Sequence, residues 1–208
     1  AKTGANVLNT YDVPSAFQAY HVKGLSAEDL EMLQTYPDVA YVQPNYIDHI
    51  MELEDKQEER ECISSADNRP WGIRRTISVQ RPGSNDPYVY DGTACGAGVE
   101  LYILDTGVLA THEDFDGRAE WIGDYAGDGE RDGNGHGTHV SSSAGGGKYG
   151  LARCSPIKAL KVCTNGGSCP TTAQLGALTR LATAAATGKK IVANMSLGGR
   201  GTNQATLD

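Results

Sequence analysis

The stretch Leu101–Val108, LYILDTGV, decides how the rest of the sequence is interpreted. It is a strand-length apolar run that ends on Asp105, Thr106 and Gly107. An aspartate in such a place fits two unrelated catalytic arrangements. In one, two carboxylates together activate a water molecule. In the other, one carboxylate orients a histidine that activates a serine, so the rest of the chain has to distinguish between them.

The pattern around this run predicts an α/β fold. Two further apolar runs of strand length occur at residues 156–163, PIKALKVC, and 189–197, KKIVANMSL. Between them, residues 171–187 carry leucines at three-residue steps, which predicts a helix that ends at Gly188. A strand, a helix and a strand of these lengths form a right-handed crossover between parallel strands. We therefore expect a three-layer fold, a parallel sheet with helices on both faces.

The first 50 residues predict a small α+β unit. Residues 17–22, FQAYHV, and 39–44, VAYVQP, are expected to be strands. A short helix is expected between the two strands, because Ser26 and Asp29 have the spacing of a capping box at its start. Two strands and a helix bury little surface, so this unit should be stable only if it packs on another body. An acidic linker at residues 51–63 separates it from the main body at residues 64–208.

Charge, hydropathy and cysteine content exclude several classes of protein. The net charge of −8 argues against a nucleic-acid partner, which requires a basic surface. No apolar run approaches the roughly 20 residues of a membrane-spanning helix. Cys163 and Cys169 flank a Gly-rich turn, so a disulfide between them is one alternative. The absence of a CxxC pair argues against a zinc cluster, and the odd number of five cysteines leaves at least one thiol unpaired within the chain.

The chemistry depends on which partner Asp105 has. A carboxylate pair needs a second Asp-Thr-Gly or Asp-Ser-Gly sequence, and none occurs. The stretch 132–140, DGNGHGTHV, supplies His136 and His139 where a loop is expected to enter a helix. A carboxylate at the carboxyl end of a parallel strand would meet such a histidine in the crevice where these sheets bind ligands. From the spacing alone, three roles for His136 stay open: catalysis, a structural buried histidine, and metal binding together with His139.

Four segments in order, ILDTGV, HEDFDGRA, DGNGHGTHV and VANMSLGG, resemble the subtilisin-like serine proteases, particularly the secreted fungal proteinase K group. The RPWGI stretch resembles the start of the mature domain, and residues 13–50 resemble the later part of its inhibitory propeptide. The resemblance implies that Asp105 is the triad aspartate, that His136 is the general base and that His139 packs. It also implies that an extended substrate pairs with an edge segment formed by Ser196, Leu197, Gly198 and Gly199.

The resemblance also implies what the 208 residues lack. The nucleophile of the family lies in a Gly-Thr-Ser-Met-Ala sequence, which does not occur here, and the oxyanion-hole asparagine is expected after residue 208. Ser141, Ser142 and Ser143 follow His136 on its own helix, so they are not expected to replace the nucleophile. We expect a catalytically incomplete fragment of a secreted protease, which begins after the first strand and helix of the propeptide and is processed near residues 63/64.

Two other classes of function remain as alternatives. The first is a pseudoprotease or an inhibitory module that binds another protease. The second is a metal-binding protein that uses His136 and His139. No cofactor and no metal site are assigned, although the resemblance allows calcium. The expected partners are an extended peptide substrate and the chain's own propeptide, with no nucleic acid and no membrane.

Overall fold

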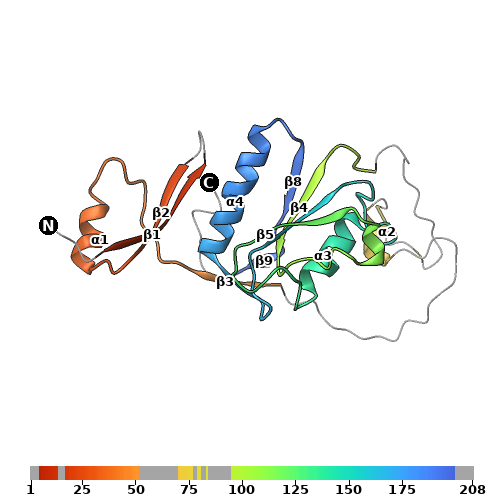
Figure 1. The fold of residues 1–208 in the computed structure, drawn as a ribbon, viewed down its shortest axis with the longest axis horizontal. Helices are drawn as coiled ribbons and strands as arrows, with labels where there is room; N and C mark the ends of the chain where they lie inside the picture. The colour runs from red at the N-terminus through yellow and green to blue at the C-terminus, as the bar shows by residue number, and fades with distance from the viewer. Residues whose placement is uncertain are drawn as a thin grey trace.

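The computed structural model describes residues 5–13, 17–51, 70–76, 79–80, 83 and 95–199. At its centre is a four-stranded sheet in the order β5-β6-β4-β8, with every pair of neighbours parallel (Figure 1). Its strands are β4 (Glu100–Asp105), β5 (Ala119–Asp124), β6 (Ile157–Lys161) and β8 (Ile191–Asn194). The predicted α/β class with a parallel sheet is therefore confirmed.

Helices cover the sheet on both faces. Successive side chains of a strand point to opposite faces, so the side chains of β4 pack alternately against the helix on one face and the helix on the other. Leu101 and Ile103 lie in a core cluster with side chains of α3 (His136–Gly145). Tyr102 and Leu104 lie in another cluster with side chains of α4 (Thr171–Ala186). The three predicted layers are thus present, and the helix predicted at residues 171–187 ends, as expected, before Gly188 with its positive φ of 81°.

The run at residues 189–197 forms two strands rather than the single one predicted. The register pairs Ile103 with Asn194, and the chain leaves the parallel sheet after that residue. Residues Leu197–Gly198 form β9, which belongs to a second sheet. Strand β5 was not predicted, because its sequence AEWIGD is only partly buried and lacks an apolar run.

The N-terminal unit differs from the prediction in its strands. Strand β2 (Phe17–Lys23) was expected, but its antiparallel partner is β1 (Asn6–Val13), whose polar sequence is mostly exposed. The strand predicted at residues 39–44 is wrong, since no strand among the described residues pairs with that segment. The short helix α1 (Ala27–Leu33) begins at the predicted capping box formed by Ser26 and Asp29.

The N-terminal unit packs on the main body, as its small size requires. Tyr11 of β1 and Leu175 of α4 share a small buried cluster, and the Tyr11 hydroxyl donates to the carbonyl oxygen of Thr172 at 3.2 Å. In Figure 1, α4 lies between the β1–β2 ribbon and the parallel sheet. Two further helices are short, α2 (Trp71–Arg75) and the 3-10 helix η1 (Glu113–Phe115). Among the described residues, no helix combines the length and apolar character needed to cross a bilayer.

A three-stranded sheet brings together three segments that are far apart in sequence. Strand β3 (Ile47–Ile50) lies between β7 (Ser168–Pro170) and β9 and is antiparallel to both. Because β9 follows the carboxyl end of β8, this sheet stands beside the carboxyl edge of the parallel sheet. It is at that edge that β4 ends in Asp105.

Candidate active site

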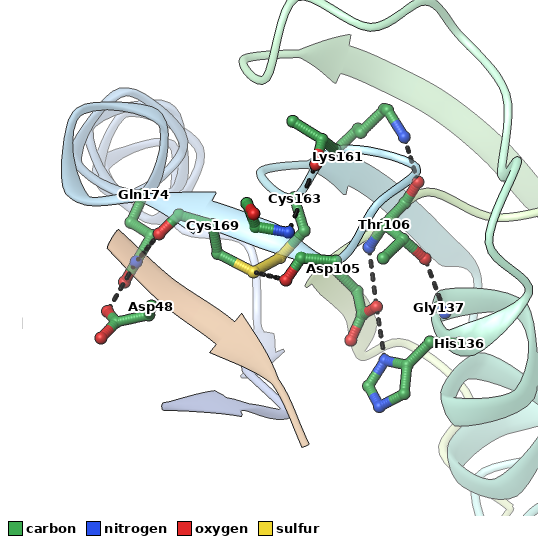
Figure 2. The surroundings of a disulfide bond; sticks show 12 residues. Asp48, Asp105, Thr106, His136, Gly137, Lys161, Cys163, Cys169 and Gln174 are labelled. Carbon is green, nitrogen blue, oxygen red and sulfur yellow. Dashed lines mark hydrogen bonds and ion pairs between the residues drawn. A yellow bond between two sulfur atoms is a disulfide. The ribbon is translucent and has the colours of Figure 1, made fainter. Parts of the chain in front are cut away.

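The structure brings Asp105 and His136 together, as the sequence predicted. Asp105 is the last residue of β4 and His136 the first residue of α3, and the two residues are 0% and 4% exposed. The Nδ1 atom of His136 lies 2.7 Å from Oδ1 of Asp105 (Figure 2). A proton on Nδ1 is stabilised by this contact, which leaves Nε2 as the basic nitrogen of the neutral ring.

A glycine permits this close approach of helix to strand. A Cβ atom on Gly137 would overlap the carbonyl oxygen of Gly107, so only glycine fits where α3 meets the loop after β4. The amide of Gly137 donates to the Thr106 hydroxyl at 3.0 Å. Gly135, with φ of 97°, precedes the helix and turns the chain into it. The glycines of the DGNGHGTHV stretch thereby set the distance between Asp105 and His136.

Asp132 organises the loop that carries His136, a role that the sequence analysis did not assign. Its Oδ1 accepts from the Thr106 hydroxyl at 2.9 Å and from the Gly135 amide at 2.8 Å, and its Oδ2 accepts from the Thr138 amide at 2.9 Å. Burial alone would raise the pKa of Asp132, but the hydrogen bonds from Thr138, Gly135 and Thr106 outweigh burial and lower it. Asp132 therefore ties β4 and the start of α3 together as a carboxylate.

Burial dominates the electrostatics of Asp105. It raises the pKa of this carboxyl above its ordinary value, although the contacts with His136 and the Thr106 amide act in the opposite direction. Oδ1 accepts from both of these groups, whereas Oδ2 is buried without a hydrogen-bond partner among the described residues. The buried Lys161 ammonium donates to the carbonyl oxygen of Thr106, and desolvation lowers the pKa of this lysine.

Two disulfides join described residues, and one of them adjoins the site. The bridge between Cys163 and Cys169, one of the predicted alternatives, is present. The amide of Cys163 donates to the carbonyl oxygen of Asp105 at 3.1 Å, so this bridge is joined directly to the end of β4 (Figure 2). The second bridge, Cys95–Cys154, spans 59 residues and has no local sequence signal. Cys62 lies outside the described residues.

The segment predicted to pair with an extended peptide is already paired with a strand of this chain. Gly198 and Leu197 of β9 lie opposite His49 and Ile50 of β3. The amide of Met51 donates to the carbonyl oxygen of Ser196 at 3.2 Å, and that of Ile50 donates to Gly167 at 3.1 Å on the other side. Residues 47–51 therefore lie as a middle strand between β7 and β9, and we call this position between the two strands the cleft. The predicted processing site near residues 63/64 lies outside the described residues.

The remaining candidates do not join the pair. His139 is exposed, whereas the resemblance implied that it packs. The hydroxyl of Ser141 donates to the carbonyl oxygen of Gly137 at 2.7 Å, that of Ser142 donates to Asp114, and Ser143 is exposed. In the part of the chain that the structure describes, no group of three or more His, Cys, Asp or Glu side chains is placed to hold a metal ion.

Known proteins resemble this chain in sequence. The sequence profile of the subtilase family matches residues 96–207. Subtilisin-like protease 7 of Arthroderma otae is 37% identical over 96% of this chain and 47% of its own length. Proteinase T of Parengyodontium album is 42% identical over 65% of this chain and 47% of its own length. The chain spans about half the length of these two curated relatives.

One solved structure supports the same fold. The crystal structure of a cold adapted subtilisin-like serine proteinase superposes with a TM-score of 0.54 at 34% identity. It covers 66% of this chain, and the match covers 49% of that protein.

Proposed function

The chain belongs to the subtilase family, and from that premise we propose that Asp105 and His136 are two members of the catalytic triad of a serine endopeptidase. The observation that carries the proposal is the buried 2.7 Å contact between His136 Nδ1 and Asp105 Oδ1. In this role His136 Nε2 takes the proton of the attacking serine and later delivers it to the leaving amine. Asp105 holds the ring orientation and stabilises the imidazolium that forms.

The proposed substrate is a peptide in extended conformation. Ser196, Leu197, Gly198 and Gly199 offer main-chain hydrogen bonds on one side, and residues 167–169 offer them on the other. Strand β3 makes these bonds in the structure, which supports a cleft that recognises a peptide by its main chain. Recognition of this kind tolerates many side chains, so the substrate class is broad.

The proposal predicts that the 208 residues alone do not hydrolyse peptides. They contain no Gly-Thr-Ser-Met-Ala sequence, and the hydroxyls of Ser141 and Ser142 are engaged in hydrogen bonds away from the pair. Removal of the serine costs about 10⁶ in turnover in subtilisin itself. The test compares the 208-residue chain with a longer product of the same gene that encodes the serine, using a chromogenic peptide. Turnover by the short chain, or its persistence in the His136→Ala form of the longer product, would overturn the assignment.

We further propose that residues 1–50 act as an inhibitory propeptide and that the protein is secreted. The occupation of the cleft by β3 supports the first point, and the two disulfides support an oxidising compartment. The same occupation favours a second candidate function, a module that binds other proteases. Adding the 208-residue chain to a subtilisin-like protease in trans tests it, since inhibition at micromolar concentration supports this candidate and undiminished activity removes it. No cofactor is proposed, and no calcium site is assigned.

A further inference from the structure

The register of β3 in the cleft places one acidic side chain against a buried amide. The amide of Met51 donates to the carbonyl oxygen of Ser196, and this hydrogen bond fixes the register. Three residues earlier in the chain, Asp48 lies opposite Cys169 of β7. There Oδ2 of Asp48 accepts a hydrogen bond of 2.8 Å from Nε2 of Gln174. Figure 2 shows the two side chains pointing toward each other, at the end of α4 that faces β7.

Gln174 is a polar group that the cleft keeps away from water. Its side chain is 0% exposed in the first turns of α4, among the apolar residues of that helix. Its Nε2 donates both hydrogens, one to Asp48 and one to the carbonyl oxygen of Cys169 at 3.0 Å. Its Oε1 is buried and has no partner among the described residues. If Asp48 were apolar, an amide hydrogen would be unpaired in addition to this oxygen.

The opposite wall of the cleft leaves room for the carboxylate. A Cβ on Gly199, the residue after β9, would overlap Oδ1 of Asp48. The carboxylate therefore lies between the Gln174 amide on one side and a position without a side chain on the other. Asp48 is only partly buried, so a charge here keeps some contact with water.

We propose that Gln174 is a specificity-determining residue that selects peptides with a hydrogen-bond-accepting side chain, such as aspartate, three residues before the residue bound to Ser196. This inference rests on the proposed function, because it describes which peptides the same cleft prefers. Hydrogen bonds to charged acceptors are the stronger ones, and a buried donor without an acceptor carries its full desolvation cost. An apolar residue at this position binds more weakly because it meets a buried amide.

Strand β3 allows a test in the 208-residue chain that does not depend on catalysis. Hydrogen exchange of the Ile50 and Met51 amides reports how firmly β3 occupies the cleft. We expect Asp48→Leu to speed this exchange about tenfold, while Asp48→Asn, which keeps an acceptor, stays within about twofold of the native rate. Asp48→Asn exchanging as fast as Asp48→Leu would overturn the inference, and so would an unchanged rate in Asp48→Leu.

Replacing Gln174 by an apolar residue should reverse the preference for aspartate over leucine at position 48. In a Gln174→Leu background, Asp48→Leu should slow the exchange of the two amides relative to Asp48, because an apolar wall then faces an apolar side chain. Equal effects of Asp48→Leu in both backgrounds would show that Gln174 does not select the side chain at position 48. Gln174→Met provides a second background of similar volume, and unchanged exchange of the β4 and β6 amides confirms that each variant remains folded.

A longer product that carries the serine separates this inference from the proposed function. Two peptides that differ only by aspartate or leucine at the selected position are compared, and kcat/KM should favour aspartate about tenfold. A longer product without any peptidase activity overturns the proposed function while leaving the exchange result standing. An active product with equal kcat/KM for both peptides overturns the inference alone.

Discussion

The backbone of Gly137 lies against the carbonyl oxygen of Gly107 with no room between them for a side chain. Gly137 follows the candidate general base, and Gly107 lies two residues after the aspartate of the pair. The approach of these two glycines therefore sets how far α3 stands from the end of β4. The distance between His136 and Asp105 depends on a contact that neither of them makes.

Gly137→Ala is expected to destabilise the chain by about 3 kcal/mol, because the added methyl forces the backbone of α3 away from Gly107. Urea unfolding measures the loss. Gly72→Ala is the matched control, since Gly72 lies in a helix and a Cβ there meets nothing within 4 Å. A loss no larger than that of the control would contradict the account of this packing.

Asp105→Asn is expected to leave the fold intact and release His136 from its orientation. The amide has the shape of the carboxylate and avoids the burial of a charge. Its uncharged oxygen is a weaker acceptor for the Nδ1 proton than the carboxylate, and its NH₂ group cannot favour a proton there. Nitrogen NMR of the imidazole should show a defined Nδ1–H tautomer in the native chain and a mixture in the variant. In a longer, active product the same change should lower kcat by about 10⁴. A tautomer that stays the same in the variant would argue against control by Asp105.

The two disulfides are expected to contribute unequally to stability. Loop-closure entropy predicts about 4 kcal/mol for the bridge that spans 59 residues and about 2 kcal/mol for the bridge that spans 6. Paired alanine variants, Cys95→Ala with Cys154→Ala and Cys163→Ala with Cys169→Ala, should follow that order in urea unfolding. The second pair should also speed hydrogen exchange in β7, whereas the first should not. The reverse order in unfolding would mean that native packing around Cys163 outweighs chain entropy.

Tyr102 is expected to make stability fall at high pH. Burial, together with the hydrogen bond to Glu100, raises the pKa of Tyr102 from 10.0 to about 12. The folded state holds the Tyr102 proton more tightly than the unfolded state. The contribution of this proton to the free energy of unfolding is therefore complete below pH 10 and is lost as the pH rises through 12. The stability difference between the native chain and Tyr102→Phe should therefore be constant below pH 10 and shift in favour of the variant above it. Difference spectra at tyrosinate wavelengths check the titration, and a midpoint near 10 would contradict it.

The predictable parts of the fold share a local signal. Strands β4 and β6 are largely buried on both faces and lie within mostly apolar runs, which marks them in the sequence. The capping box at Ser26 and the glycine after α4 are equally local. Strands β1 and β5 are partly exposed and have no such pattern, and β3 exists only because β7 and β9 hold it.

The same distinction holds at the site. Asp105 and His136 were found because each stands at a boundary that the sequence displays, the end of an apolar run and the start of a Gly-flanked helix. Asp132 was missed because nothing in its own stretch shows that Thr106, 26 residues earlier, donates to it. Gln174 was missed because it lies on a helix among apolar positions, and only the register of β3 brings Asp48 to it, 126 residues away in sequence.

The sequence by itself determined the α/β class, the parallel direction of its apolar strands and the positions of the candidate residues Asp105 and His136. These features follow from hydrophobic periodicity and from the motifs that end each run, and both are local properties of the chain. Only the tertiary structure decided that residues 47–51 fill the cleft and that a buried amide meets their aspartate. Main-chain pairing is open to almost any sequence, so the strand that enters a sheet depends on which edges packing leaves available.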